Sequence, residues 1–317
     1  MLVLVALLSA LAAPFLAPHT TGDRFPDLLN APPTRPRVVD RSGRLRAPFI
    51  YPWRIASRLE QRYEEDAAAP VGLLWFAGGR LVSSSDNART PLLLLGTDSY
   101  GRDVFSRLLF GARVSLALSI LAAIGAVVLG GAVGGVSGYA GGASDDLLMR
   151  ATDMVMVLPM MYVALGLRAV LPLVLSPATV FVFLAGIFAL VGAPFVARGV
   201  RGIIRSEREL EYAVAARSLG AGHARLLGLH LLPATRGFLA VQITTLVPAF
   251  IVAEATLSYV GLGFPEPVAS WGTMLQEASN VRTFADFPWL LSPAAAMFVV
   301  VFGLNLTVQG KRSSTIR

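Results

Sequence analysis

One short string in this sequence is typical of a nucleophilic serine: the Gly-Val-Ser-Gly run around Ser137. A serine hydroxyl attacks a carbonyl carbon only when a general base lies within hydrogen-bond reach. The histidines available as that base are His19, His223 and His230, and all three fall outside the long apolar segments of the chain. We therefore expect no catalytic residue, and keep serine hydrolysis within a membrane only as an alternative interpretation.

Other kinds of chemistry are excluded by composition. Cysteine is absent from the 317 residues, which excludes disulfides, thiolate nucleophiles, thiolate zinc sites and iron–sulfur ligation by this chain. Gly310-Lys311 is no part of a P-loop, because Arg312 follows it and Asn305 stands where that motif has its first glycine. The chain is expected to be no enzyme, to hold no metal and to bind no cofactor of its own.

One acidic residue, Glu254, lies within a long apolar run. A charge at that depth in a membrane costs several kcal/mol unless it faces a partner or a cavity. A structural hydrogen-bonded role and a role in lining a transport pathway are both open, and we favour the structural one. Arg168, near the end of another apolar run, is expected to extend its charge toward the membrane surface.

The elements that position these residues are apolar and long. Apolar residues make up 55% of the chain and charged residues 15%, against about 25% charged in soluble domains, and mean hydropathy is +0.63. Segments of about 20 apolar residues are typical of transmembrane helices. We expect an all-α integral membrane protein with about six such helices, over residues 2–17, 114–136, 154–175, 178–200, 237–259 and 288–307.

Small and kinking residues recur in these segments. Gly130 and Gly134 form a GxxxG pattern, which favours close helix packing without identifying the partner. Pro159, Pro194 and Pro248 are expected to form tolerated kinks in their helices, and hinges for alternating access are the alternative.

The first apolar segment has two interpretations. Ala10-Leu11-Ala12 resembles a signal-peptide cleavage site, but no basic residue precedes the apolar run, so we favour a transmembrane helix. Residues 19–95 are rich in Pro, Arg and Ser; we expect hairpins over 38–51 and 75–82 and a short polar helix over 57–66. The predicted organisation is a first helix (1–18), an extracytoplasmic insertion (19–95) and a transmembrane core (96–317).

Arginines predict the orientation, because short cytoplasmic loops carry an excess of basic residues. Loop 201–236 is arginine-rich and the C-terminal tail is basic, whereas loop 260–287 has only Arg282. We expect both termini and loop 201–236 in the cytoplasm and the insertion outside. The basic residues of loop and tail are Arg201, Arg205, Arg208, Arg217, Arg225, Arg236, Lys311, Arg312 and Arg317.

Loop 201–236 is longer than a simple helix connection needs. Ala213, Ala216 and Gly220 have helical spacing and would form a smooth face for another protein, with Gly220 as the C-cap. A second short helix over 224–231 should end at Pro233. The alternative is an amphipathic helix that lies on the lipid.

Segment 96–113 combines charges with an apolar stripe. Asp98, Arg102, Asp103 and Arg107 are spaced so that neighbours could form ion pairs. The stripe, residues 104–109, predicts an amphipathic helix at the outer membrane surface before the chain enters the membrane. We favour a structural elbow; a gate or a dock for another protein is the alternative.

Three segments together resemble a known family. Ala215-Ala216, then Gly220 and Leu232-Pro233, match the EAA loop of bacterial ABC-importer permeases. Two further segments resemble the dipeptide/oligopeptide/nickel branch of that family, in the order typical of its second, C-type permease. The resemblance covers residues 95–309. The matching residues are Gly96, Thr97, Asp98, Gly101, Arg102, Asp103, Ser106, Arg107, Gly111, Ala112 and Arg113 in one segment and Glu254, Ala255, Leu257, Ser258, Gly261, Leu262, Gly263, Pro267, Trp271 and Gly272 in the other.

The resemblance implies a permease subunit in a bacterial cytoplasmic (inner) membrane. Such a subunit forms a heterodimer with a second permease, docks two ATP-binding subunits, receives short peptides from an extracytoplasmic substrate-binding protein, contacts membrane lipid and binds no nucleic acid. Another small solute such as nickel is the alternative cargo, and a rhomboid-like intramembrane protease is the remote alternative. The residues implied in ATPase docking are Glu211, Tyr212, Ala215, Ala216, Arg217, Leu219, Gly220 and Pro233, with Glu254 as a possible pathway residue.

Two features depart from the family pattern. Val214 stands where the family has the glutamate of its EAA triplet, so any polar contact of that glutamate is absent. The insertion of residues 19–95 is longer than is usual for the branch, so its role does not follow from the resemblance.

Overall fold

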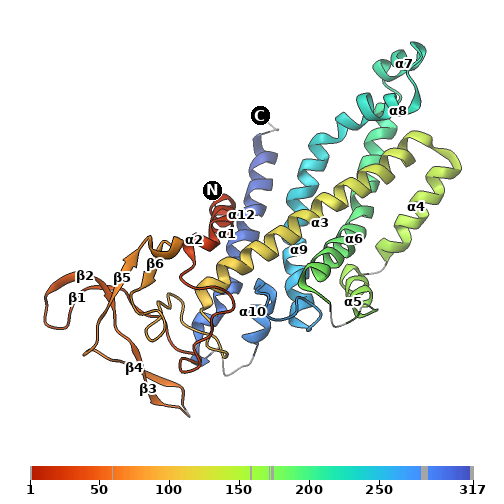
Figure 1. The fold of residues 1–317 in the computed structure, drawn as a ribbon. Coiled ribbons are helices and arrows are strands. Elements are labelled where there is room, and N and C mark those ends of the chain that lie inside the picture. Colours follow the sequence, from red (N-terminus) through yellow and green to blue (C-terminus); the bar gives the residue numbers. More distant parts are fainter. Residues whose placement is uncertain are drawn as a thin grey trace. The chain divides into compact units, whose positions relative to one another are not determined.

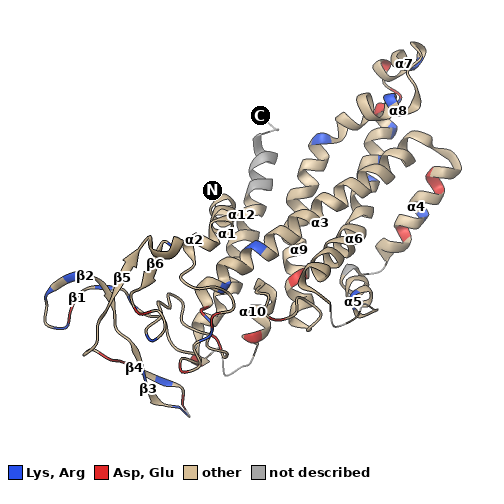
Figure 2. Ribbon diagram, viewed as in Figure 1, with Lys and Arg blue, Asp and Glu red and all other residues tan. Residues whose placement is uncertain are grey.

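The computed structural model describes residues 2–58, 60–157, 159–170, 172, 175–279 and 285–314 (Figure 1). Within them, four helical stretches are long and apolar enough to cross a membrane: Val104–Ala140, Pro177–Glu207, His223–Tyr259 and Pro288–Leu306. Figure 2 shows how sparse charged residues are along α3 (Val104–Ala140). No charged residue follows Arg113 in this helix. The predicted class, an all-α membrane protein with an insertion, is confirmed.

The two remaining apolar segments are not simple spans. Helices α4 (Gly142–Val157) and α5 (Met160–Val170) would pass together as one span, but they are bent by 90° at the break that contains Pro159. Helix α1 (Leu2–Leu11) has 10 residues and is followed by the single turn α2 (Ala13–Leu16). Pro194 and Pro248 lie inside α6 (Pro177–Glu207) and α9 (Arg236–Tyr259) without ending them.

The chain packs as two units. Unit 1 comprises Met1–Ser115 and Ser258–Val300, and unit 2 comprises Leu116–Leu257 and Val301–Arg317. Their boundaries cut through α3, α9 and α12 (Ser292–Ser314). The domain boundaries expected from the sequence stay predictions.

In unit 2, the glycines of α3 pack against α6. A Cβ atom at Gly130 would collide with the carbonyl oxygen of Ala193, and one at Gly134 with that of Ala197. The four-residue spacing is the same on both helices, so the two backbones meet along matching ridges. The GxxxG pattern therefore serves a contact within this chain.

In unit 1, the insertion is a small antiparallel β structure. Four strands have the order β1-β2-β5-β6, and β3 pairs with β4. The two predicted hairpins are confirmed as β1–β2 and β5–β6, the latter closed by the turn η1 (Ala77–Gly79). The strands are β1 (Arg37–Val39), β2 (Leu45–Ile50), β3 (Trp53–Ser57), β4 (Arg62–Glu65), β5 (Val71–Trp75) and β6 (Val82–Ser84).

The short polar helix expected over 57–66 is wrong. Ser57 ends β3 and pairs with Arg62 of β4. Trp53 and Tyr63 pack against a core of Leu28, Ala31 and Leu93. This burial favours the alternation of a strand over the helical propensity of the polar residues between them.

Loop 201–236 contains α7 (Glu211–Ser218), α8 (His223–Arg225), a π-helical turn η2 (Leu226–Leu231) and a 3-10 turn η3 (Leu232–Thr235), which leads directly into α9. Pro233 was expected to end a helix, and this is wrong: helical structure continues through it. Proline removes one backbone N–H, and the π turn before it and the 3-10 turn that contains it accommodate that loss within the helical path.

Candidate functional site

Helix α7 forms a tip beyond the ends of α6 and α9 in unit 2 (Figure 1). Its C-terminus is closed by Gly220, which has φ +85°. The N–H of Gly220 donates to the carbonyl of Arg217 (3.0 Å), and that of Ala221 donates to the carbonyl of Ala216 (3.0 Å). These two bonds form a Schellman motif. The predicted glycine C-cap is therefore confirmed.

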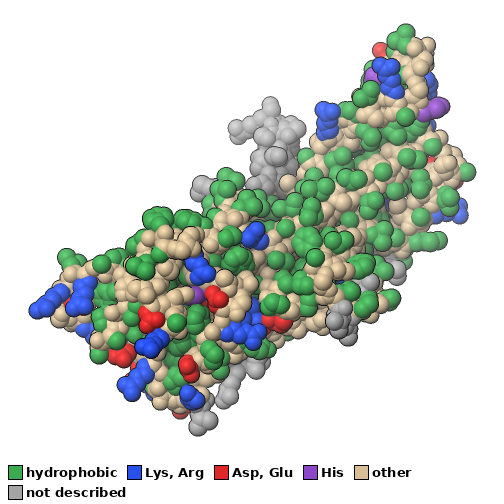
Figure 3. Space-filling model, viewed as in Figure 1, with side chains coloured by type: hydrophobic (Ala, Val, Ile, Leu, Met, Phe, Trp, Pro, Cys, Tyr) green, Lys and Arg blue, Asp and Glu red, His purple; other side chains and the backbone are tan. Residues whose placement is uncertain are grey.

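The exposed face of this tip differs from the expected one. Ala213 is fully buried within unit 2, so it contributes nothing to a smooth outer face. Tyr212 and Val214 are exposed instead, and Leu219 has 89% of its surface accessible. Hydrophobic side chains are visible at the tip in Figure 3. An apolar side chain this exposed at a helix end is suited to entering a pocket on another protein.

The loop is tied to the end of α3. The Arg208 guanidinium donates to the carbonyl of Tyr139 (3.0 Å), and the Tyr139 hydroxyl contacts Nδ1 of His223 (2.5 Å). Tyr212 donates to Glu207 (2.6 Å). Partial desolvation of its hydroxyl, followed by this bond and the charge of Glu207, raises the pKa of Tyr212 to about 12. These contacts hold the loop in one position relative to α3 and α6.

A second set of contacts clamps α3, α4 and α6 together. Asp145 on α4 accepts two hydrogen bonds of 2.5 Å from Arg201 on α6, and it also accepts from Ser137 on α3. Bidentate arginine–carboxylate pairs of this kind are among the stronger polar contacts. The Ser137 hydroxyl therefore meets a carboxylate held by arginine and no histidine base, which is unlike a hydrolase site.

A buried ionic cluster lies in unit 1. Nε of Arg102 lies 2.7 Å from Asp98, its Nη1 lies 2.6 Å from Glu266, and its Nη2 lies 2.8 Å from Glu277. Arg107 shares Glu277 at 2.8 Å. Both guanidinium groups are almost fully buried. The predicted pairing of Asp98 with Arg102 is confirmed. The predicted pairing of Asp103 with Arg107 is wrong, because Asp103 meets His19 and Arg107 meets Glu277. The sequence offered no local signal for the two glutamates.

Charges in this cluster do not balance. Two arginines face three carboxylates, those of Asp98, Glu266 and Glu277. Burial raises the pKa of Glu277 to about 7, although Arg107 and Arg102 act to lower it. Burial of Glu277 therefore opposes its ionisation, while the two guanidinium groups favour it.

Tight turns position the cluster. Gly96 and Gly101 have φ of +70° and +73°. A Cβ atom at Gly96 would collide with the carbonyl oxygen of Ala31, and one at Gly101 with that of Phe25. Both glycines are thus required by the left-handed backbone and by close approach of the insertion.

Asp103 joins a separate pair. It lies 3.1 Å from Nδ1 of His19 and accepts from Ser106 (2.5 Å), while Nε2 of His19 contacts Asn87 at 2.9 Å. Thr97 donates to the carbonyl of Leu28. The motif of residues 96–107 thus holds the insertion to the start of α3.

The separate elbow helix expected over this segment is wrong. Helix α3 begins at Val104 and continues without a break for 37 residues, and Arg113 is exposed on it. Val104 and Leu108 pack against Met274 of α10 (Trp271–Glu277) and Leu290 of η4 (Pro288–Leu291). The apolar stripe therefore faces protein and not lipid.

Glu254 and Arg168, the two charged residues noted above within apolar segments, are both buried. Glu254 is completely buried on α9, and its structural or pathway role stays a prediction. Arg168 has 3% of its surface accessible, so the expected extension to the membrane surface is wrong. Helix α5 packs against α6.

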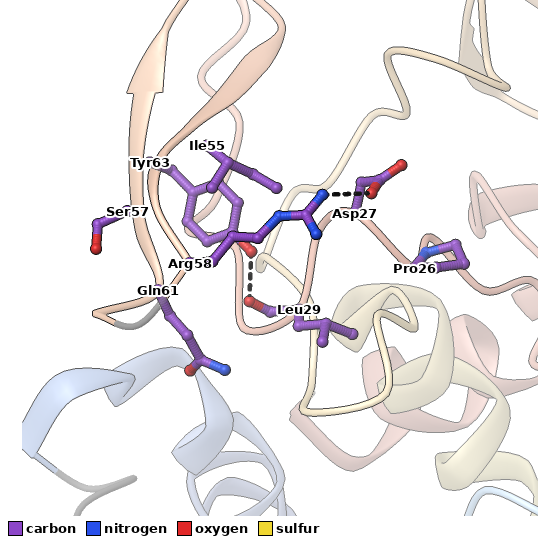
Figure 4. Close-up of a pocket in the computed structure, with 8 residues that line it drawn as sticks. All are labelled: Pro26, Asp27, Leu29, Ile55, Ser57, Arg58, Gln61 and Tyr63. Carbon is purple, nitrogen blue, oxygen red and sulfur yellow. Dashed lines mark hydrogen bonds and ion pairs between the residues drawn. The ribbon is translucent and has the colours of Figure 1, made fainter.

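A small pocket in the insertion has a volume of 140 Å³ (Figure 4). Tyr63 donates to the carbonyl of Leu29 (2.6 Å) at its base, and Arg58 and Asp27 approach to 3.8 Å across its mouth. Burial raises the pKa of Tyr63. Both charged side chains are highly exposed, so their pair adds little stability. The pocket lies between the β3–β4 hairpin and the segment of residues 26–29.

The long apolar helices are those of an integral membrane protein, and the tip of α7 carries exposed apolar side chains. Residues 126–310 match the family described as "Binding-protein-dependent transport system inner membrane component". The chain belongs to this family, and it is a multi-pass membrane permease.

Three curated relatives are permease proteins of oligopeptide, dipeptide and glutathione transport systems. The chain is 36% identical over 220 residues to the oligopeptide transport system permease protein OppC of Bacillus subtilis, which covers 69% of this chain and 70% of the relative. It is 36% identical to the dipeptide transport system permease protein DppC of the same organism (68% and 65%). Identity to the glutathione transport system permease protein GsiD of Pectobacterium atrosepticum is 33% (69% and 71%). The resemblance found in the sequence is confirmed.

Proposed function

We propose that this chain is one of two different permease subunits of an ABC importer for short peptides. Separate ATP-binding subunits dock on α7 and hydrolyse ATP, and a substrate-binding protein delivers the peptide from outside. The termini and loop 201–236 are cytoplasmic. The chain itself performs no covalent chemistry.

The geometry of the α7 tip carries this proposal. A short helix ended by a glycine Schellman motif presents Leu219, Val214 and Tyr212 outward from unit 2. Membrane channels and single-chain transporters have no need of such a projection. Val214 replaces the family's glutamate, so docking here depends on apolar contact at that position.

Force applied to α7 has a continuous path into the membrane helices. Helix α6 ends at Glu207, only a few residues before α7, and η2 and η3 lead from α8 into α9 with no extended segment. Arg208 also ties the loop to α3. When ATP closes the docked subunits, displacement of α7 is expected to move these helices together as a rigid group.

Short peptides are the cargo best supported by the relatives. Their names specify oligopeptides, dipeptides and glutathione, and glutathione is itself a tripeptide. A small solute such as nickel is the alternative, and competition between labelled tripeptide and Ni²⁺ for uptake distinguishes the two.

Gly220 provides the test of docking. A β-branched residue is strongly disfavoured at positive φ, so Gly220→Val should deform the tip. We expect normal amounts in the membrane, continued ATP hydrolysis and a loss of peptide uptake of about tenfold or more, from a conformational cost of about 1–2 kcal/mol.

Gly222 offers a matched control two residues away. Its φ is −68°, and nothing lies near an added Cβ atom, so Gly222→Val should transport normally. Unchanged uptake in Gly220→Val, or an equal loss in both variants, would contradict the proposed docking role.

A further inference from the structure

The β5–β6 hairpin of the insertion exposes a cluster of large apolar side chains. Trp75 and Phe76 have 55% and 70% of their surface accessible, and Leu74 before them has 46%. Residues 71–79 contain no charged side chain. An exposed apolar cluster of this kind marks a surface that contacts a membrane or another protein.

This tip is fastened to the end of the first apolar segment. The N–H of Leu81 donates to the carbonyl of Phe15 (2.7 Å), and the Phe76 and Phe15 rings stack with centroids 6.2 Å apart. Arg80 turns its guanidinium to the carbonyl of Pro18. Phe76 has a φ of +56°, a conformation rare for a bulky residue, which directs its ring to α2. Hydrophobic side chains gather over this part of the chain in Figure 3.

The exposed apolar surface continues onto α1. Leu4, Leu8 and Leu11 lie on one face at helical spacing and are exposed, Leu11 by 72%. Helix α1 carries no charged residue. The hairpin tip therefore adds, through the contact of Phe76 with Phe15, to an exposed helix face suited to lipid.

Packing also gives the depth of the tip. Ala13 and Ala17, on either side of Phe15, pack against Leu109 of α3. Leu109 precedes by five residues the uncharged stretch of α3 that follows Arg113, a helical rise of about 7 Å. The headgroup layer on each side of the hydrocarbon core is about 5–7 Å thick. Tryptophan is enriched at that level, with an apolar ring face and an N–H that stays hydrated.

We propose that the β5–β6 hairpin is a membrane-interface anchor, with Trp75 and Phe76 inserted among the lipid headgroups beside α1 and α2. It holds the insertion against the bilayer surface. The inference requires only that α3 spans the membrane, and it stands apart from the proposed cargo and from ATPase docking.

Lipid quenching of a fluorophore tests this anchor. The chain lacks cysteine, so Phe76→Cys in the full-length chain can be labelled with NBD and placed in phosphatidylcholine liposomes brominated near the glycerol backbone. Leu45→Cys is the matched control, because Leu45 is 82% exposed at the turn of the β1–β2 hairpin. We expect a blue-shifted emission at position 76, quenched by lipid at least about twofold more than at position 45.

Equal quenching at both positions would overturn the proposal. A blue shift at position 76 without lipid quenching would also overturn it, because a protein then covers the tip. Should Phe76→Cys disturb the hairpin, intrinsic fluorescence serves instead: brominated lipid must quench a component that disappears in Trp75→Phe.

Discussion

At Glu277, burial raises the pKa of the carboxyl group, whereas Arg107 and Arg102 lower it. Its pKa of about 7 exceeds the ordinary value of 4.5, so the folded state binds a proton more tightly than the unfolded state. Stability from this group is therefore present at low pH and is lost as pH rises from about 4.5 through 7. The full shift corresponds to about 3 kcal/mol.

Glu277→Gln should remove this dependence, because the amide resembles the protonated carboxyl. The remaining cluster then pairs two arginines with two carboxylates. We expect the unfolding midpoint of the solubilised protein to fall less between pH 5 and 8 in the variant, with equal or higher stability at pH 8. Glu266→Gln is the control, since the side chain of Glu266 is 55% exposed. An unchanged pH slope in Glu277→Gln would refute the assignment.

Residue pairing shows where prediction from the sequence ends. Asp98 and Arg102 are four residues apart, so a local pattern could predict their pair, although they lie in the turn before α3 and not on a helix. Glu266, which pairs with Arg102, is 164 residues away, and Glu277 on α10, which pairs with Arg107, is 170 residues away. No local pattern indicates such pairs, because tertiary packing alone creates them.

At the scale of elements, the glycines of α3 make the sharpest prediction. Gly134→Ala places a methyl group against the backbone of Ala197. Overpacking of this kind costs about 1–3 kcal/mol. We expect a lower yield in the membrane and a lower temperature of thermal aggregation for the solubilised chain.

Gly131 supplies the comparison, three residues away on the same helix. Nothing lies near a Cβ atom added there, and alanine is the better helix former by about 1 kcal/mol. Gly131→Ala should therefore be neutral or stabilising. Equal stability of the two variants would show that α3 and α6 are not in close backbone contact.

Elements were predictable where their signal is local. Long apolar runs located the spanning helices, and alternation with turn residues located two hairpins. The helix over 57–66 and the elbow over 104–109 were wrong because Trp53, Tyr63, Val104 and Leu108 are buried by segments distant in the sequence. The exposed face of α7 was wrong in part for the same reason, since Ala213 packs inward.

For the whole molecule, the distribution of arginines predicts the topology. Ser218 lies exposed on α7 and Ser85 lies exposed after β6, so each tolerates a single cysteine. In intact cells, an impermeant maleimide should label Ser85→Cys and should reach Ser218→Cys only after lysis. Labelling of position 218 in intact cells would reverse the proposed orientation and with it the site of ATPase docking.

The ionic cluster also imposes an order on biogenesis. Arg102 leaves the ribosome 164 residues before Glu266, a delay of about 10–30 s at ordinary rates of synthesis. During that interval both arginines lack Glu266 and Glu277 and have only Asp98 of the three cluster carboxylates. Unit 1 is thus completed only after every residue up to Glu277 has been translated, and any truncation before Glu266 leaves both arginines with Asp98 alone of the three carboxylates.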